Sequence, residues 1–128
     1  MQFEEFIGRV QVQARLKRDE SISISQAVLE TLGERLDRKV RNGLEAQLPK
    51  ELKDFLLARH ESTDRYNLSE FYNRVGARAD LKHGDTIERT KQVLSVFRQA
   101  IPEGELQDMA ESLPREYGEL FDKELYSH

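Results

Sequence analysis

Cysteine is absent from the 128 residues of this chain. Its absence excludes a disulfide framework, a thiolate metal site and a cysteine nucleophile. Long apolar runs are absent too, and none approaches the roughly 18 residues that a membrane-spanning helix needs. Residues 1–6 are acidic and amphipathic rather than basic and then apolar, which is not the pattern of a secretory signal. Together these absences predict a soluble, cytoplasmic protein that does not act at a membrane.

Sequence signals of catalysis or cofactor binding are also missing. The glycines are scattered singly, so there is no phosphate-binding or dinucleotide-binding loop, and no serine lies in a strand–turn–helix elbow. The three histidines, His60, His83 and His128, have no second His, Asp or Glu at a helical i, i+4 metal-ligand spacing on a shared apolar face. The sequence therefore predicts no metal, no cofactor and no catalytic residue. An enzymatic activity has no support in it.

Charge is plentiful but mixed in sign. The chain has 24 acidic and 20 basic residues, for a formal net charge of −4. This balance argues against bulk binding to nucleic acid or to a membrane surface. The two signs are unevenly distributed along the chain, because residues 9–41 carry a local charge of +3 and residues 103–124 a local charge of −6.

One hexapeptide occurs twice. Gln47–Leu52 (QLPKEL) returns 65 positions later as Ser112–Tyr117 (SLPREY). When residues 3–63 are paired with 68–128 without a gap, fourteen positions are identical, whereas composition alone would give roughly four. We interpret the chain as a tandem duplication, with repeat 1 (1–60) and repeat 2 (66–128) packed as a single helical domain over 1–128.

Each repeat is predicted to contain four helices, over about residues 2–57 and 68–125. Apolar residues recur at helical spacing in 3–14 and again in 68–79. Residues 21–25 alternate serine with isoleucine as a strand does, but their counterparts lie in the helical pattern of 85–100. We therefore expect a helix there, with its serines on a polar face or in a cap.

The ends of these helices carry further signals. Gly84 and Asp85 are typical of a turn followed by a helix cap, and Asn67 with Glu70 predicts a second cap. Proline marks the start of three predicted helices. The fourth helix of each repeat is expected to begin at the Leu-Pro step and to run to about Leu57 and Leu125.

Two features of the predicted helices allow both a structural and a functional interpretation. Glutamate lies four residues before arginine in Glu5/Arg9 and in Glu70/Arg74. These pairs either support their helices in solvent or form two symmetry-related polar sites. The phenylalanines either form a shared core or line a groove for a partner helix. The four phenylalanines concerned are Phe6, Phe55, Phe71 and Phe121.

Several segments resemble a known family. The segments are 28–36 (VLETLGERL), 46–49 (AQLP), 101–106 (IPEGEL) and 113–121 (LPREYGELF). They resemble the bacterial helical family catalogued as domain of unknown function 2267, over nearly the whole chain. The resemblance implies an all-helical, duplicated, bacterial cytoplasmic protein, and it implies no established activity, cofactor or catalytic residue.

We expect a non-catalytic module that acts through protein contacts, either with a partner or by self-association. Its predicted binding face is the acidic C-terminal half. A small-molecule-binding or enzymatic protein that uses a cleft between the repeats is the alternative. Nucleic-acid binding through the basic residues of 35–41 is a weaker candidate, because acids dilute that field and no aromatic residue accompanies it. The predicted partner-binding residues are Glu105, Asp108, Glu111, Glu116 and Glu119.

Overall fold

The computed structural model describes residues 1–59 and 63–121. Within these residues the chain forms one all-α domain of eight helices and no strands, so the predicted fold class is confirmed at this level. Residues 21–25 are helical despite their strand-like alternation. The helices are α1 (Phe3–Ala14), α2 (Arg18–Arg35), α3 (Arg38–Glu45), α4 (Lys50–Leu57), α5 (Leu68–Ala79), α6 (His83–Ala100), α7 (Glu103–Ser112) and the 3₁₀ helix η1 (Arg115–Leu120).

Proline and asparagine set several helix starts as expected. Pro49, Pro102 and Pro114 each lie immediately before a helix, with φ between −57° and −64°. The proline ring fixes this angle, and its missing N–H is not needed at a helix start. Asn67 caps α5, since its side-chain oxygen accepts a hydrogen bond of 2.9 Å from the amide of Glu70.

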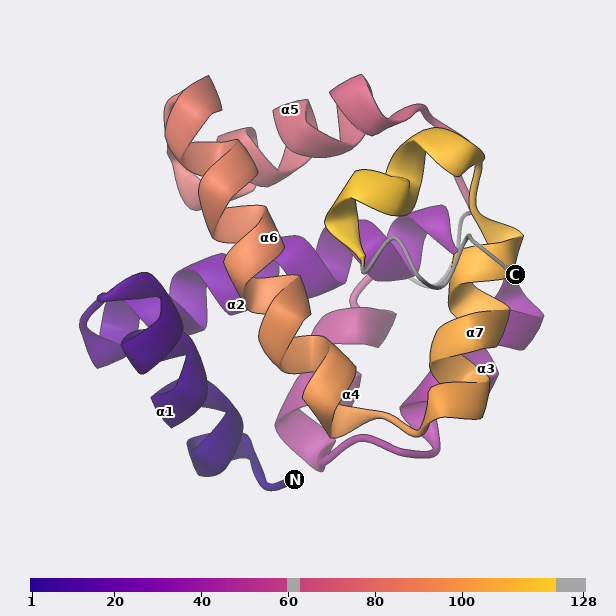
Figure 1. Ribbon diagram of the computed structural model, residues 1–128, viewed down its shortest axis with the longest axis horizontal. Helices are drawn as coiled ribbons and strands as arrows, with labels where there is room; N and C mark the ends of the chain where they lie inside the picture. The colour runs from indigo at the N-terminus through magenta and orange to yellow at the C-terminus, as the bar shows by residue number, and fades with distance from the viewer. Residues whose placement is uncertain (60–62, 122–128) are drawn as a thin grey trace.

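Two long helices cross at the centre of the molecule, with α6 in front of α2 in Figure 1. Two shorter helices, α1 and α5, each contact both members of this pair. On the opposite side of the molecule from α1, α3 lies beside α7 (Figure 1), while α4 packs along α2.

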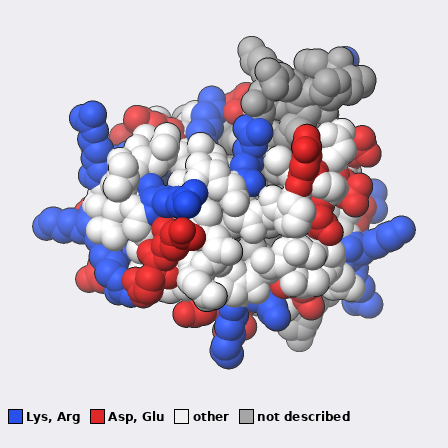
Figure 2. Space-filling view, turned by 60° about the horizontal axis from the view of Figure 1, so that its bottom comes forward, with Lys and Arg blue, Asp and Glu red and all other residues white. Residues whose placement is uncertain are grey.

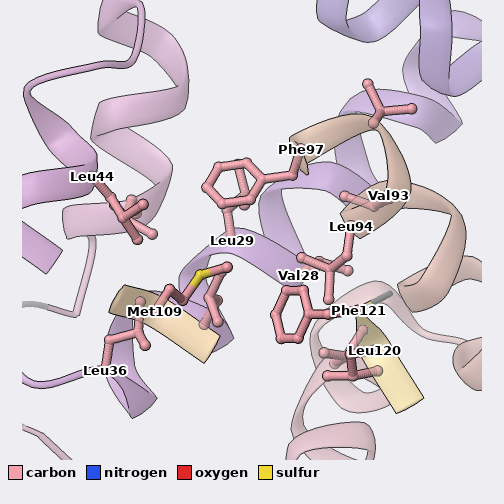
Figure 3. Close-up of a cluster of buried hydrophobic side chains, with 14 of the residues drawn as sticks. Val28, Leu29, Leu36, Leu44, Val93, Leu94, Phe97, Met109, Leu120 and Phe121 are labelled. Atoms are coloured by element: carbon pink, nitrogen blue, oxygen red, sulfur yellow. The ribbon is translucent and has the colours of Figure 1, made fainter. Parts of the chain in front are cut away.

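The core lies where α2 and α6 face each other. Figure 3 shows the side chains of these helices meeting those of α3, α7 and η1. All of these residues are at most 7% exposed, and the hydrophobic effect of burying them favours the folded state. The labelled members are Val28, Leu29, Leu36, Leu44, Val93, Leu94, Phe97, Met109, Leu120 and Phe121.

The phenylalanines belong to this core rather than to a groove. Phe6 and Phe71 are fully buried and Phe121 is buried, while the half-buried Phe55 packs edge-to-face on Phe3 with ring centroids 6.2 Å apart. A phenylalanine-lined docking groove is therefore wrong, and the core interpretation is confirmed.

The fourth predicted helix differs between the two halves. α4 is α-helical, whereas its counterpart η1 is a 3₁₀ helix that ends at Leu120, with Phe121 extended. The expected continuation of this helix is thus wrong at Phe121, and residues 122–125 lie outside the described part. α4 also approaches α2 closely at Gly33. An ideal Cβ at Gly33 would lie 1.8 Å from the carbonyl oxygen of Leu56, and the position 65 residues later is Arg98.

Two expectations at the start of the second helices are also wrong. α6 begins at His83, two residues early, so Asp85 lies in its first turn and is not its cap. Ser21 and Ser25 are fully buried against the core, while Ser23 alone of the three is exposed. Thr86 and Thr90, 65 positions later, are fully buried too. Small hydroxyl side chains fill these places because the helices pack closely there.

Candidate functional site

The largest hollow described on the surface lies between α3 and α7. Its volume is about 520 Å³, within the range of ligand-binding pockets, and it is open to solvent. One wall is acidic and comes from α7, whereas the other comes from α3 and contributes one lysine. The residues that line it are Lys39, Val40, Gly43, Glu105, Asp108, Glu111 and Ser112.

The periodicity of α7 puts its acids on this wall. Leu106 and Met109 are buried against the core, while Asp108 and Glu111 are exposed on the opposite side of the helix. Glu105 is half-buried in the first turn, where a negative charge favours the helix dipole. Three of the five predicted partner-binding residues therefore share one hollow.

The other two predicted residues lie elsewhere and have partners inside the molecule. A carboxylate oxygen of Glu116 accepts a hydrogen bond of 3.2 Å from the amide of Leu68, at the start of α5. Glu119 accepts one of 2.6 Å from the hydroxyl of Tyr72. Burial and this bond raise the pKa of Tyr72 above its ordinary value. The structure thus separates Glu116 and Glu119 from the acids of the hollow.

Two arginines of the basic cluster at 35–41 are buried and bind backbone carbonyl oxygens within the molecule. The Arg41 guanidinium is buried and donates to the carbonyl oxygen of Gly33 at 2.8 Å, and the buried Arg35 donates to that of Tyr66 at 2.7 Å. Burial, and then the charge of Arg38, lower the pKa of Arg41. On the face in Figure 2, basic and acidic side chains are interspersed around neutral residues. This face offers no field of one sign to a nucleic acid.

A network of charges joins α2 to α5. Arg74 Nη1 lies 3.1 Å, and Arg78 Nη2 3.0 Å, from Glu34 Oε1. Burial alone raises the pKa of Glu34, but the hydrogen bonds from the two arginines outweigh it and hold that pKa below its ordinary value. Arg74 also pairs with Glu70 at 2.8 Å, so this predicted pair is part of a larger site.

Sequence reasoning found Glu70 and Arg74 but missed Glu34. The helical spacing of four residues indicated the first pair, whereas Glu34 and Arg78 are 44 positions apart and nothing local connects them. One feature of the sequence could have indicated Glu34, namely its position next to the apolar face of α2, near Leu32 and Leu36.

Two tyrosines connect this network to η1. The Tyr117 hydroxyl donates to the Tyr66 carbonyl oxygen at 2.7 Å, and the Arg35 guanidinium lies 5.3 Å from the Tyr117 ring centroid. Burial raises the pKa of Tyr117 to about 12. The two rings therefore stay neutral and hold residues 63–67 against α2.

A smaller hollow lies where α2 begins and α5 ends. Its volume is about 390 Å³, and its lining combines apolar side chains with carboxylates and one arginine. The arginine, Arg89, donates to the carbonyl oxygen of Ala14 at 3.0 Å. The residues that line this hollow are Leu16, Asp19, Glu20, Ser23, Ile24, Ala79, Asp80, Leu81 and Arg89.

Metal ligands are not grouped in the described ranges 1–59 and 63–121, which hold no cluster of three His, Asp or Glu able to bind an ion. His60 and His128 lie outside these ranges. None of the helices described is long and apolar enough to cross a membrane.

Comparison with known proteins identifies the family of the chain. No curated protein matches the chain. A family model described as "Uncharacterized conserved protein (DUF2267)" matches residues 3–120, which is nearly the whole sequence. The chain therefore belongs to the DUF2267 family.

Proposed function

We propose that this chain is a protein-binding module whose acid-lined hollow between α3 and α7 takes a basic, amphipathic segment of a partner. The observation that carries the proposal is that two acids of α7 line the hollow without a partner. Within the described residues, Glu105 and Asp108 have no hydrogen-bonded or ionic partner, and both line an open hollow. A basic segment would pair with these carboxylates and place its apolar side chains on Val40.

A charge-reversal experiment tests this proposal. The tagged protein is purified at native level and low salt from its own cells, and the proteins that accompany it are identified by mass spectrometry. We expect a stoichiometric partner that dissociates as salt rises. The variant Glu105→Lys/Asp108→Lys/Glu111→Lys should lose this partner.

The control carries the same change of charge at other exposed positions. Glu51→Lys/Asp54→Lys/Glu88→Lys also raises the formal net charge by six, away from the hollow. It should retain the partner. A complex that survives reversal of the three α7 acids would overturn the proposal. Loss of the partner from both variants would also overturn it, because the loss would then be an effect of net charge alone.

The smaller hollow, where α2 begins and α5 ends, favours a second candidate, the binding of a small molecule. Both halves contribute to its lining, which includes the apolar Leu16, Ile24 and Leu81 together with charged side chains. Native mass spectrometry of the same purified sample distinguishes the candidates, since a small ligand would add a discrete mass and a protein partner would not.

We further infer that the two halves are copies of one four-helix unit. Helices 65 positions apart make reciprocal contacts, because α1 packs on α6 as α5 packs on α2. Arg15 and Asp80, also 65 positions apart, share a left-handed backbone with φ of 56° and 55°. These correspondences support the duplication that the repeated hexapeptide predicted.

A further inference from the structure

The groove between α2 and α5 is filled by the chain itself. Residues 63–66 are outside any helix, and the side chain of Tyr66 enters the groove with only 8% of its surface exposed. Its hydroxyl donates to the carbonyl oxygen of Thr31 at 2.6 Å, and it lies 3.2 Å from Glu34 Oε1. The Arg74 guanidinium lies 4.1 Å from the ring centroid.

An acid two residues before this tyrosine completes the contact. Asp64 Oδ2 accepts a hydrogen bond of 2.9 Å from Arg74 Nη2, and the amide of Asp64 donates to the carbonyl oxygen of Glu34 at 3.0 Å. One arginine therefore binds the carboxylate and covers the aromatic ring two positions later.

The corresponding place in the other half is open. Between α1 and α6 lies a hollow of about 420 Å³, which we call the α1–α6 groove. Its lining residues are Glu5, Gly8, Arg9, Val12, Gln13, Val96 and Gln99. Five of these lie 65 positions from residues of the filled groove that contact Tyr66 or Asp64, or that bind the residues making those contacts. The pairs are Glu5 with Glu70, Arg9 with Arg74, Gln13 with Arg78, Val96 with Thr31 and Gln99 with Glu34.

The open groove already has the arrangement of the filled one. Arg9 lies 3.4 Å from Glu5, and its Nη1 donates to Gln99 Oε1, as Arg74 does to Glu34. The difference is exposure, since the side chain of Arg9 is 47% exposed and that of Arg74 only 24%. Met1, which is 65 positions before Tyr66, packs against the core and does not line this groove.

We propose that the α1–α6 groove binds an extended segment of a partner protein that carries an acidic residue two positions before a tyrosine. Arg9 would pair with the acid and cover the ring, and the side-chain oxygen of Gln99 would accept a hydrogen bond from the tyrosine hydroxyl. Val12, which is 81% exposed beside this site, would supply apolar contact. The proposal rests on the pairing of the two halves and is independent of the hollow between α3 and α7.

The differences between the two grooves suit a reversible ligand. Gln99 replaces Glu34 and Gln13 replaces Arg78, so the open groove lacks two of the charges of the filled one. Neutral walls cost less to desolvate when a segment binds from water, and they hold it less strongly. The filled groove is built for a permanent contact, and the open groove for one that dissociates.

The test uses a peptide with the sequence of residues 63–67, blocked at both ends, as the probe. It is titrated into the ¹⁵N-labelled full chain to millimolar concentration while the backbone amides are followed by NMR. We expect saturable shifts in α1 and in the C-terminal half of α6. A peptide with alanine in place of its tyrosine should give no saturable shift, and Arg9→Ala should weaken binding about tenfold, as expected for the loss of a charged hydrogen bond.

A gain-of-binding variant gives the sharper result. Gln13→Arg/Gln99→Glu restores the charges of the filled groove at two exposed positions, so it should fold normally and bind the peptide about tenfold more tightly. Unchanged affinity in this variant, shifts confined to α2 and α5, or the absence of saturable shifts would each overturn the proposal. None of these outcomes bears on the salt-sensitive partner of α7.

Discussion

Two residues with side chains hold a backbone conformation that suits glycine. Arg15 ends α1 with φ 56° and ψ 49°, and Asp80 ends α5 with φ 55° and ψ 54°. For a residue with a Cβ this region costs about 1–2 kcal/mol. At both ends the left-handed residue lets the next amide bond back to the last turn of its helix, as Leu16 does to Gln11 at 3.2 Å.

The strain at Arg15 leads to a stability prediction. Arg15→Gly should raise the free energy of unfolding by about 0.5–1 kcal/mol, because relief of the strain exceeds the extra chain entropy of glycine. Urea denaturation measures the change. Arg15→Ala removes the same exposed side chain but keeps the Cβ, and it should give no such gain. An equal gain from alanine would show that the side chain, and not the backbone, was responsible.

At the scale of the elements, one glycine decides how two helices pack. The carbonyl oxygen of Leu56 in α4 lies where a Cβ at Gly33 would be, so α2 and α4 approach backbone to backbone. Gly43 in α3 has nothing within 4 Å of the same position. Both glycines lie inside helices, and their surroundings in the fold distinguish them.

This contrast predicts opposite effects of one substitution. Gly33→Ala should destabilise the protein by about 3 kcal/mol, because α4 would have to move away from α2. Gly43→Ala should stabilise it by about 0.5–1 kcal/mol through helix propensity. Thermal and urea unfolding of the two variants measures both values. A Gly33→Ala protein as stable as the wild type would contradict the close approach.

Local pattern predicted the elements well and the sites poorly. Apolar spacing was enough for α1 and α5, and the pairing of the halves corrected the strand-like residues 21–25. The difference between α4 and η1 could not be predicted, because the hexapeptides at which they begin are alike. Among the candidate site residues, the spacing of α7 placed three acids on one wall, whereas the hydrogen-bond partners of Glu116 and Glu119 come from α5, which is distant in sequence.

At the scale of the whole molecule, the halves are joined by a buried charge network rather than by apolar contact alone. Glu34 is 8% exposed, and it accepts from Arg74, Arg78 and Tyr66. Its pKa is lowered in the folded state from an ordinary value of 4.5. Its contribution to stability is therefore complete above that value and is lost as the pH falls through the folded-state pKa.

A pH series tests this contribution. Glu34→Gln should lower the free energy of unfolding by about 2 kcal/mol at neutral pH, since an acceptor of charged hydrogen bonds is lost and two arginines remain partly unpaired. The deficit relative to the wild type should shrink as the pH falls below the ordinary value of 4.5 and through the lowered folded-state pKa of Glu34, where the wild-type carboxylate gains a proton. Glu88→Gln, at an exposed position, is the control and should show no deficit at either pH. A deficit that persists unchanged in acid would assign the effect to shape instead of charge.

The reciprocal packing of α1 on α6 and of α5 on α2 has a consequence for biosynthesis. When α4 leaves the ribosome, the surfaces of α1 and α2 that α6 and α5 will cover are still exposed to water. Residues such as Val10 and Val28 are fully buried when all the helices are in place. The N-terminal half must therefore wait for the C-terminal half, and during that interval its uncovered side chains are the ones that a nascent-chain chaperone would meet.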